Sequence, residues 1–446
     1  MALTRRTLDR PVDLLAVHAA DPIRFPCLLE TVAATSAGSG FDLLLASNGE
    51  RIESALGRSD ASRGGFLAAL QASFAAQAVV RDADLDLPFR GGWAIALDYE
   101  FAGECEPALQ LPVAPHGLPY AVALRAPAAA ITDRASGRTT LVAEPGYDAL
   151  LDALEHGLRE SPPVRPWQGV IEPFEEPPQR FIDGVARIHE YLAAGDVFQV
   201  NLSRLWQAQL PDGLDPAALY AALRVSNPAP FGGSFRDRRR QILSSSPERL
   251  VRVSGAEVST RPIAGTRPRF AGDDDGARVR ELLAHPKERA EHVMLIDLER
   301  NDLGRLAQSG SVEVDQLMQV ETYAHVHHIV SNLRAALRPG TTPGEVLRAM
   351  FPGGTITGAP KFRCMQIIAE LEASGRGAYT GALGYLNRDG DMDLNILIRS
   401  FEIVDRRLHF RAGSGIVIDS DPLHELDETR AKARGLLAAL GARGAG

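Results

Sequence analysis

The sequence predicts an α+β fold. Strand patterns occur in adjacent pairs, and amphipathic helix patterns lie among them without the strict strand–helix alternation of a doubly wound sheet. The chain has 446 residues, of which 45% are apolar, so a substantial core can form. This length fits two or three average domains or one large domain.

The first third of the chain is rich in turns and contains three strand-like segments: FDLLLAS (41–47), GGWAIALDYE (91–100) and YAVALRAP (120–127). Residues 161–180 then hold six prolines, which interrupt regular structure. We therefore divide the chain into an N-terminal region (1–160), a connecting segment (161–180) and a region that carries the chemical motifs (181–446).

The third region has clearer patterns. Phe181, Val185, Ile188 and Leu192 mark an amphipathic helix that Gly195 ends. The spacing predicts two further helices, at Glu288–Leu303 and Glu425–Leu440. The predicted strands are Val197–Leu202, Leu383–Leu386, Leu394–Ile398, Leu408–Arg411 and Ile416–Ile418.

The formal net charge is −9 and no long basic block occurs, which argues against nucleic acid as a partner. An anionic substrate would need a local positive site. Three scattered cysteines indicate a reducing compartment. We see no signal peptide and no run of roughly 18 apolar residues that would cross a membrane. A cytoplasmic protein is the expectation.

Two glutamate pairs stand out, Glu288 with Glu291 and Glu425 with Glu428. Each pair has i, i+3 spacing, so both carboxylates share a helical face, and apolar residues continue that face. One interpretation is a shared divalent cation. The other is two surface helices with acidic first turns, which the spacing alone favours because charged helix starts are common.

Three glycine-containing segments could approach a ligand closely. Thr260–Arg269 combines three arginines with Gly265, although a basic surface loop is an equal alternative. Gly353–Lys361 is a glycine- and threonine-rich turn before a helix and could bind an anion, but it lacks the spacing of a nucleotide loop. Arg411–Gly415 is a second glycine loop or only a tight turn.

Three single residues have two interpretations each. Arg399 ends an apolar strand, where a guanidinium usually meets a carboxylate or phosphate of the protein or of a ligand. Lys432 lies four residues beyond Glu428 and forms a salt bridge with it or reaches a ligand. His328 lies in the apolar sequence HVHHIVS, where a histidine is more often a satisfied core residue than a catalyst.

Together with Ser246–Glu248 and HPKERAEHVMLIDLERNDLGR (285–305), these segments resemble the chorismate-utilising enzymes: anthranilate synthase component I, aminodeoxychorismate synthase component I, and the isochorismate and salicylate synthases. The resemblance covers about Phe181 to Leu440 and is looser before that. It implies one α+β unit in which two β-sheets pack together with helices outside.

The resemblance also implies site residues. Glu291 and Glu428 would hold Mg²⁺, supported by Glu288 and Glu425, and the metal would bind the ring carboxylate of chorismate. Glu248 and His328 match positions of proton transfer and leaving-group contact. The other implied substrate-binding residues are Gly265, Thr355, Tyr385, Arg399, Gly413, Ser414, Gly415 and Lys432.

Two positions bear on the reaction. Family members that add water have a lysine where this chain has Gln199, and glutamine is no base at neutral pH, so ammonia is the expected nucleophile. Aminodeoxychorismate synthases usually have a nucleophilic lysine where this chain has Ala264, before Gly265 and Thr266, and anthranilate synthases usually have alanine there.

Other motifs, such as SPER (246–249), FPGGTITG (351–358) and GDMD (390–393), look more like aminodeoxychorismate synthase, which we therefore favour. Anthranilate synthase is the alternative, and a non-catalytic ligand-binding paralogue is a third. No cysteine lies in a Gly-x-Cys-x-Gly elbow, so we expect ammonia from a separate glutamine amidotransferase subunit.

Overall fold

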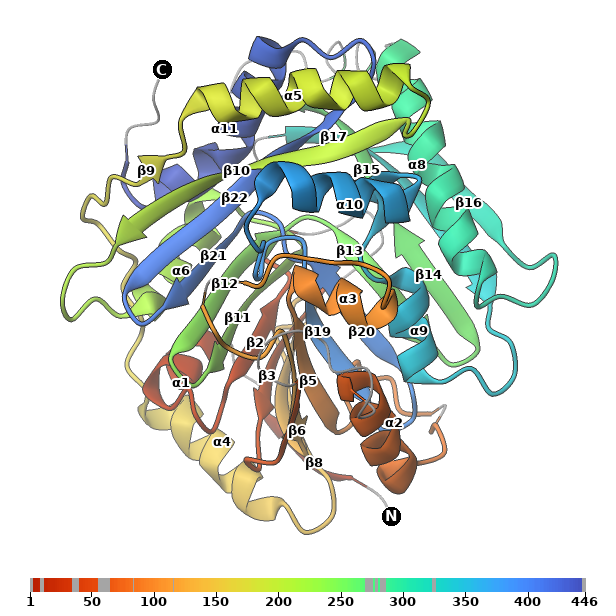
Figure 1. Ribbon diagram of the computed structural model, residues 1–446. Helices are drawn as coiled ribbons and strands as arrows, with labels where there is room; N and C mark the ends of the chain where they lie inside the picture. Colours follow the sequence, from red (N-terminus) through yellow and green to blue (C-terminus); the bar gives the residue numbers. More distant parts are fainter. Residues whose placement is uncertain are drawn as a thin grey trace.

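A computed structural model describes residues 3–8, 12–33, 40–54, 65–82, 84–114, 116–268, 276, 280, 286–322 and 326–442. Within these residues the strands form two large antiparallel sheets with helices outside them (Figure 1). The predicted α+β class with two packed sheets is confirmed.

The first sheet has twelve strands in the described residues. In spatial order they are β1 (Thr4–Leu8), β8 (Thr139–Ala143), β7 (Ala128–Asp133), β3 (Phe41–Ala46), β2 (Cys27–Glu30), β11 (Phe231–Asp237), β12 (Arg240–Ser246), β21 (Ser400–Val404), β22 (Arg407–Ile416), β10 (Gln199–Gln209) and β18 (Gly358–Ala359), with β9 (Phe174–Glu175) also paired to β10.

The second sheet has ten strands in the same described part of the chain. Their order is β15 (Ile263–Pro268), β17 (Val326–Ala336), β14 (Glu257–Arg261), β13 (Arg249–Ser254), β20 (Met392–Ile396), β19 (Ala382–Asn387), β5 (Gly92–Leu97), β6 (Ala121–Ala126) and β4 (Arg51–Glu53), with β16 (Glu313–Thr322) paired to β17.

Side-chain alternation along the strands explains how both sheet faces become buried. Leu43 and Leu45 of β3 point toward Ala94 and Ala96 of β5, and together they belong to the core between the sheets. Their sequence neighbours, such as Leu44, point to the opposite face and pack under helices. Because both faces are covered, these strands read as continuous apolar runs in the sequence.

Helices cover the outer faces of both sheets. Their bounds are α1 (Leu14–Ala20), α2 (Gly65–Gln77), α3 (Ala102–Cys105), α4 (Asp148–Glu160), α5 (Pro178–Ala193), α6 (Pro216–Ser226), α8 (Pro286–Gly304), α9 (Pro343–Met350), α10 (Lys361–Glu372) and α11 (Pro422–Ala439), with short 3₁₀ turns η2 (Tyr99–Phe101) and η3 (Gly354–Ile356). Helices α5 and α10 pack on β10, α11 on β22, and α8 on β15 and β17 (Figure 1). In the described chain, no helix combines the length and apolarity that a membrane span needs.

The three helices expected in the third region are confirmed as α5, α8 and α11. Gly195 has a φ of +77° directly after α5, as a C-terminal glycine should. Residues 1–160 supply strands to both sheets, since β2 pairs with β11 and β5 pairs with β19. Within the connecting segment 161–180, only β9 and the start of α5 are regular.

Two sequence predictions about strands are wrong. Arg411–Gly415 is no loop, because one continuous strand, β22, runs through it and pairs along its length with β10. Strand β20 ends at Ile396, so Arg399 does not close it. Arg399 instead lies in the turn before β21 with a φ of +51°. The first error arises because glycine was treated as a strand breaker. The second arises because the length of an apolar run was taken as the length of the strand.

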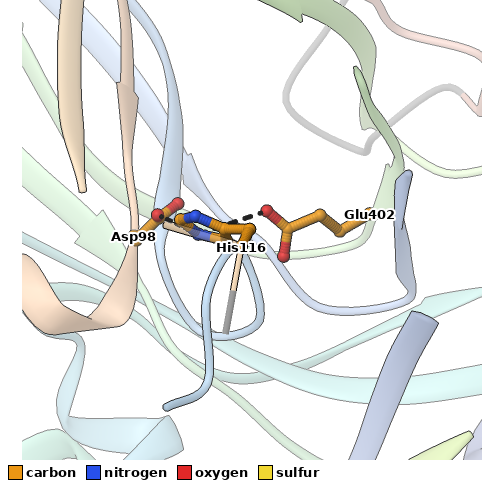
Figure 2. A group of neighbouring side chains, drawn as sticks. All are labelled: Asp98, His116 and Glu402. Carbon is orange, nitrogen blue, oxygen red and sulfur yellow. Dashed lines mark hydrogen bonds and ion pairs between the residues drawn. The ribbon is translucent and has the colours of Figure 1, made fainter. Parts of the chain in front are cut away.

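A buried ionic cluster joins the two sheets (Figure 2). Asp98 follows β5 of the second sheet, and Glu402 lies on β21 of the first. His116 Nε2 lies 3.0 Å from Asp98 Oδ2 and 3.6 Å from Glu402 Oε1. Burial opposes a charge on His116, but the hydrogen bond to Asp98 and the charges of Asp98 and Glu402 together raise the pKa of the imidazole.

Arg240 neutralises this cluster. Its Nε lies 2.6 Å from Glu402 Oε1, and its guanidinium also pairs with Asp98. The same carboxylates and His116 have ligand atoms close enough to hold a metal ion, but the guanidinium already meets both negative charges. The cluster therefore acts as an electrostatic joint between the sheets.

Arg240→Met should destabilise the protein, because it leaves Asp98 and Glu402 buried without their cation. Breaking a buried pair from one side costs about 3–5 kcal/mol, which for a chain of this size lowers the thermal midpoint by roughly 3–5 °C. Arg300→Met is the control, since Arg300 and Asp297 form an exposed pair. Equal midpoints for the two variants would contradict the joint.

Candidate active site

Gly413 and Gly415 of β22 have no side chains, so the amide side chains of Gln199 and Asn201 can lie against this strand. Gly415 is paired with Asn201, and a Cβ on Gly415 would lie 2.0 Å from Gln199 Nε2. A Cβ on Gly413 would lie 2.6 Å from Asn201 Oδ1. The oxygens Gln199 Oε1 and Asn201 Oδ1 are buried without a hydrogen-bond partner among the described residues. Unsatisfied buried acceptors of this kind leave room for donor groups of a water molecule or a ligand.

Glu425 is buried at the start of α11, as the inward stripe predicts. Its carboxylate accepts hydrogen bonds from the hydroxyl of Ser414 on β22 and from that of Ser420, the latter at 2.7 Å. Leu436 and Ala439 of the same stripe are also buried. The surface-helix interpretation is therefore wrong for Glu425.

Lys432 makes two described contacts on this side of the site, of which only the salt bridge was predicted. Its Nζ lies 2.7 Å from Glu428 Oε1, so the i, i+4 salt bridge is confirmed, and it also donates to the Gly413 carbonyl at 3.0 Å. Burial opposes ionisation of Glu428, but Lys432 and the Ser414 hydroxyl lower the pKa of its carboxyl. Glu428 is thus a carboxylate at neutral pH, directly beside the glycine strand.

Glu248 lies in the link between β12 and β13 and is 5% exposed. Burial raises the pKa of its carboxyl to about 7, although the Thr355 hydroxyl, the Ile263 N–H and the charges of Lys432 and Arg399 oppose this. Thr355 Oγ1 has no well-formed hydrogen bond to another described residue. At neutral pH this carboxyl can therefore hold or release a proton.

The inward face of helix α8 overlaps only partly with the stripe that the sequence predicts, which it shares at Leu295. Glu291 is half-buried, whereas His292, Leu295, Glu299 and Asp302 are buried. The side chain of Glu288 lies outside the described residues. Glu299 lies four residues after Leu295, and this spacing could have predicted its burial. The Glu288–Glu291 pair instead placed the predicted inward face nearer to Glu291.

The two remaining strands of the site are described by their backbones. Ala264 pairs with Ile329 and Thr266 with His328, and the register shifts between them, at Gly265. These positions therefore lie on neighbouring strands β15 and β17, so Thr260–Arg269 is no surface loop up to Pro268. The side chains of Ala264, Thr266 and His328 lie outside the described residues.

Tyr385 is partly buried on β19 and packs edge-on against Phe89, with ring centroids 5.7 Å apart. Burial raises the pKa of its hydroxyl. Its described contacts belong to the core between the sheets and do not join it to Glu248.

The sequence matches a model of the chorismate binding enzymes over residues 31–438. The chain belongs to this family. Anthranilate synthase component 1 of Streptomyces coelicolor is 41% identical over 384 residues, which cover 79% of this chain and 73% of that protein. Aminodeoxychorismate synthase component 1 of Bacillus subtilis is 46% identical over 269 residues, which cover 60% of this chain but only 56% of that protein.

The fold has solved counterparts. Anthranilate synthase component I of Streptococcus pneumoniae TIGR4 superposes with a TM-score of 0.76 and 31% identity, covering 93% of this chain and 92% of that one. The family and the fold that the sequence motifs imply are therefore confirmed. The chain is a chorismate-utilising enzyme of the anthranilate or aminodeoxychorismate synthase component I type.

Glu248→Gln should stabilise the protein more at alkaline than at acidic pH. The carboxyl ionises near pH 4.5 when unfolded and near 7 when folded. The folded state therefore loses stability as pH rises through this window, and glutamine avoids the loss. We expect the midpoint of the variant, relative to the parent, to rise by about 2–3 °C between pH 5 and pH 8.

Glu372→Gln is the matched control in the same melting series. Burial opposes ionisation of Glu372, but Arg376 and Arg411 lower the pKa of its carboxyl. Its folded-state stabilisation is therefore essentially complete above the unfolded pKa of 4.5 and is lost only in more acidic solution, so the midpoint of Glu372→Gln relative to the parent should stay nearly constant from pH 5 to pH 8. Parallel pH trends for the two variants would refute the assignment at Glu248.

Proposed function

We propose that the chain is component I of an aminodeoxychorismate synthase, which aminates chorismate at C4. One contact supports this choice over anthranilate synthase. Arg249 of the SPER motif forms a bidentate ion pair with Asp393 of the GDMD motif, at 2.9 and 3.0 Å. The ion pair thus joins the two motifs that favour aminodeoxychorismate synthase, at the residue that follows Glu248 in the chain.

Chorismate is a dianion, and the site offers it local positive charge inside an acidic protein. Lys432 and Arg399 are the basic groups whose charges act on Glu248. We propose that they hold the enolpyruvyl carboxylate together with the backbone of Gly413, Ser414 and Gly415, while Thr355 shapes the pocket.

We propose Mg²⁺ as the cofactor, held by Glu291 and Glu428 with support from Glu288 and Glu425. The donor chemistry fits, because carboxylate oxygens are the ligands of hard divalent cations. The hydroxyls that orient Glu425 belong to Ser414 and Ser420, so its carboxylate is fixed without a cationic partner in direct contact among the described residues. When bound, Mg²⁺ would neutralise the ring carboxylate and withdraw charge from the ring.

Glu248 is the proposed general acid. In net terms, ammonia forms the new C–N bond at C4, the C4–O bond breaks, and the departing hydroxyl takes the proton of Glu248 and leaves as water. The surplus proton on the new amine restores Glu248. A carboxyl with a pKa of about 7 suits both halves of this exchange.

Ammonia as nucleophile is supported by Gln199, which cannot activate water. We propose that a glutamine amidotransferase subunit supplies it. Cys27, Cys105 and Cys364 are all buried. Burial raises the pKa of each thiol, that of Cys364 to about 12, so none suits attack on glutamine.

Anthranilate synthase component I is the second candidate, and two observations favour it. Ala264 cannot form the lysine adduct expected of most aminodeoxychorismate synthases. The Streptomyces coelicolor and Streptococcus pneumoniae relatives also carry that name. If C4 is aminated, nitrogen must arrive without the lysine adduct or through another nucleophile.

Product identification tests the proposal. With chorismate, Mg²⁺ and ammonium, we expect a product that yields 4-aminobenzoate only after a lyase is added. Fluorescent anthranilate with released pyruvate, and no lyase, would establish the second candidate instead. Absence of turnover at every pH would favour the non-catalytic paralogue.

Glu428→Gln should abolish metal-dependent turnover, because it removes a carboxylate charge beside the glycine strand. We expect kcat to fall at least about 100-fold, because loss of a proposed ligand should cost more than loss of an outer group that supports a metal site, which typically costs 10–100-fold. Asp427→Asn on the exposed side of α11 is the control and should retain activity. Magnesium titration of both variants is the measurement, and full activity in Glu428→Gln would refute the metal assignment.

A further inference from the structure

Glu299 is a buried carboxyl close to the proposed acid that the reaction scheme does not use. It is 3% exposed and lies two turns beyond Glu291 on α8. Its Oε1 accepts the Gly354 N–H at 3.3 Å, at the start of the η3 turn. The same turn carries Thr355, whose hydroxyl contributes to the environment of Glu248. The two carboxyl groups thus flank one short turn.

The charged groups around Glu299 do not neutralise it by direct contact. Asp302, one turn on, takes the Lys361 ammonium in its own ion pair. Within the described residues, no ammonium or guanidinium pairs directly with Glu299. Burial and Asp302, with a smaller contribution from Glu248, raise the pKa of Glu299 to about 8, although Lys361 and the Gly354 N–H oppose this.

A like charge near an acid makes its proton harder to remove. Glu248 acts on Glu299 in this way across the turn, and Coulomb repulsion makes the effect reciprocal. Lys432 and Arg399 have the opposite effect, because their charges lower the pKa of Glu248. Two buried carboxylates would be costly together, so the pair keeps at least one proton at neutral pH.

We propose that Glu299 is a positioning residue for the acid at Glu248: it fixes the η3 turn through the Gly354 N–H, and its charge sets how firmly Glu248 keeps its proton. The role rests on the proposed function of Glu248. When Glu248 gives its proton to the leaving hydroxyl, Glu299 stays protonated and limits the negative charge at the site. In alkaline solution Glu299 ionises and helps Glu248 to retain its proton.

Two variants separate the two parts of this role. Glu299→Gln keeps an acceptor for Gly354 but removes the charge, so the alkaline limb of the kcat/KM profile should move to lower pH by up to about one unit. Glu299→Asp keeps the charge but shortens the reach to Gly354, so kcat should fall about 10-fold while the limb stays in place.

Glu104→Gln is the control. Glu104 is also buried and also accepts a backbone N–H, that of Leu67 at 2.6 Å, but it lies under α2, away from Glu248. Its pH profile should superpose on that of the parent. Superposed profiles for Glu299→Gln and the parent would overturn the proposal.

A measurement without turnover keeps this inference separate from the proposed function. Thermal midpoints from pH 5 to 9 for Glu248→Gln, Glu299→Gln and the double variant form a cycle. We expect the pH-dependent shifts to be non-additive, with the double variant gaining less than the two single variants together. Strict additivity would overturn the coupling, whether or not the protein turns over chorismate.

Discussion

Burial of carboxyl groups inside a two-sheet fold is the constraint on which this structure depends. A carboxylate between packed sheets is costly unless a partner compensates its charge. Asp98 and Glu402 share Arg240, and this joint fixes β5 of one sheet against β21 of the other. Glu372 pairs with Arg376 in the same way beside β10. Cations in direct contact therefore mark the carboxylates that hold the fold together.

Three carboxyl groups of the candidate site are compensated differently, whereas Glu428 pairs directly with Lys432. Glu248 is helped by a hydroxyl and a backbone N–H, Glu299 by a backbone N–H, and Glu425 by two serine hydroxyls. Such partners orient a carboxyl group without cancelling its charge. Glu248 and Glu299 therefore retain protons to neutral pH, and Glu425 remains available to a cation. This contrast separates Glu248, Glu299 and Glu425 from the carboxylates that stabilise the fold.

Helix periodicity was enough to find Glu425, Glu428 and Lys432, because their contacts depend mainly on one helical face. The same argument was less accurate for α8, because the buried face of that helix includes Glu299, which the predicted face did not. It also failed for Gly413 to Gly415, which look like a loop in sequence. Pairing with β10 makes them strand, and pairing is a long-range property that no local pattern encodes.

The sequence by itself determined the α+β class, the family and the acidic helix faces, because periodicity and motif order are local and survive in one dimension. Only the tertiary structure decided which carboxyl groups lose their water and what replaces it. Burial of Glu248 beside Thr355, and the approach of Glu299 to Gly354, join segments about 50–110 residues apart. Desolvation at such long-range contacts sets the proton affinity, and with it the chemistry of the site.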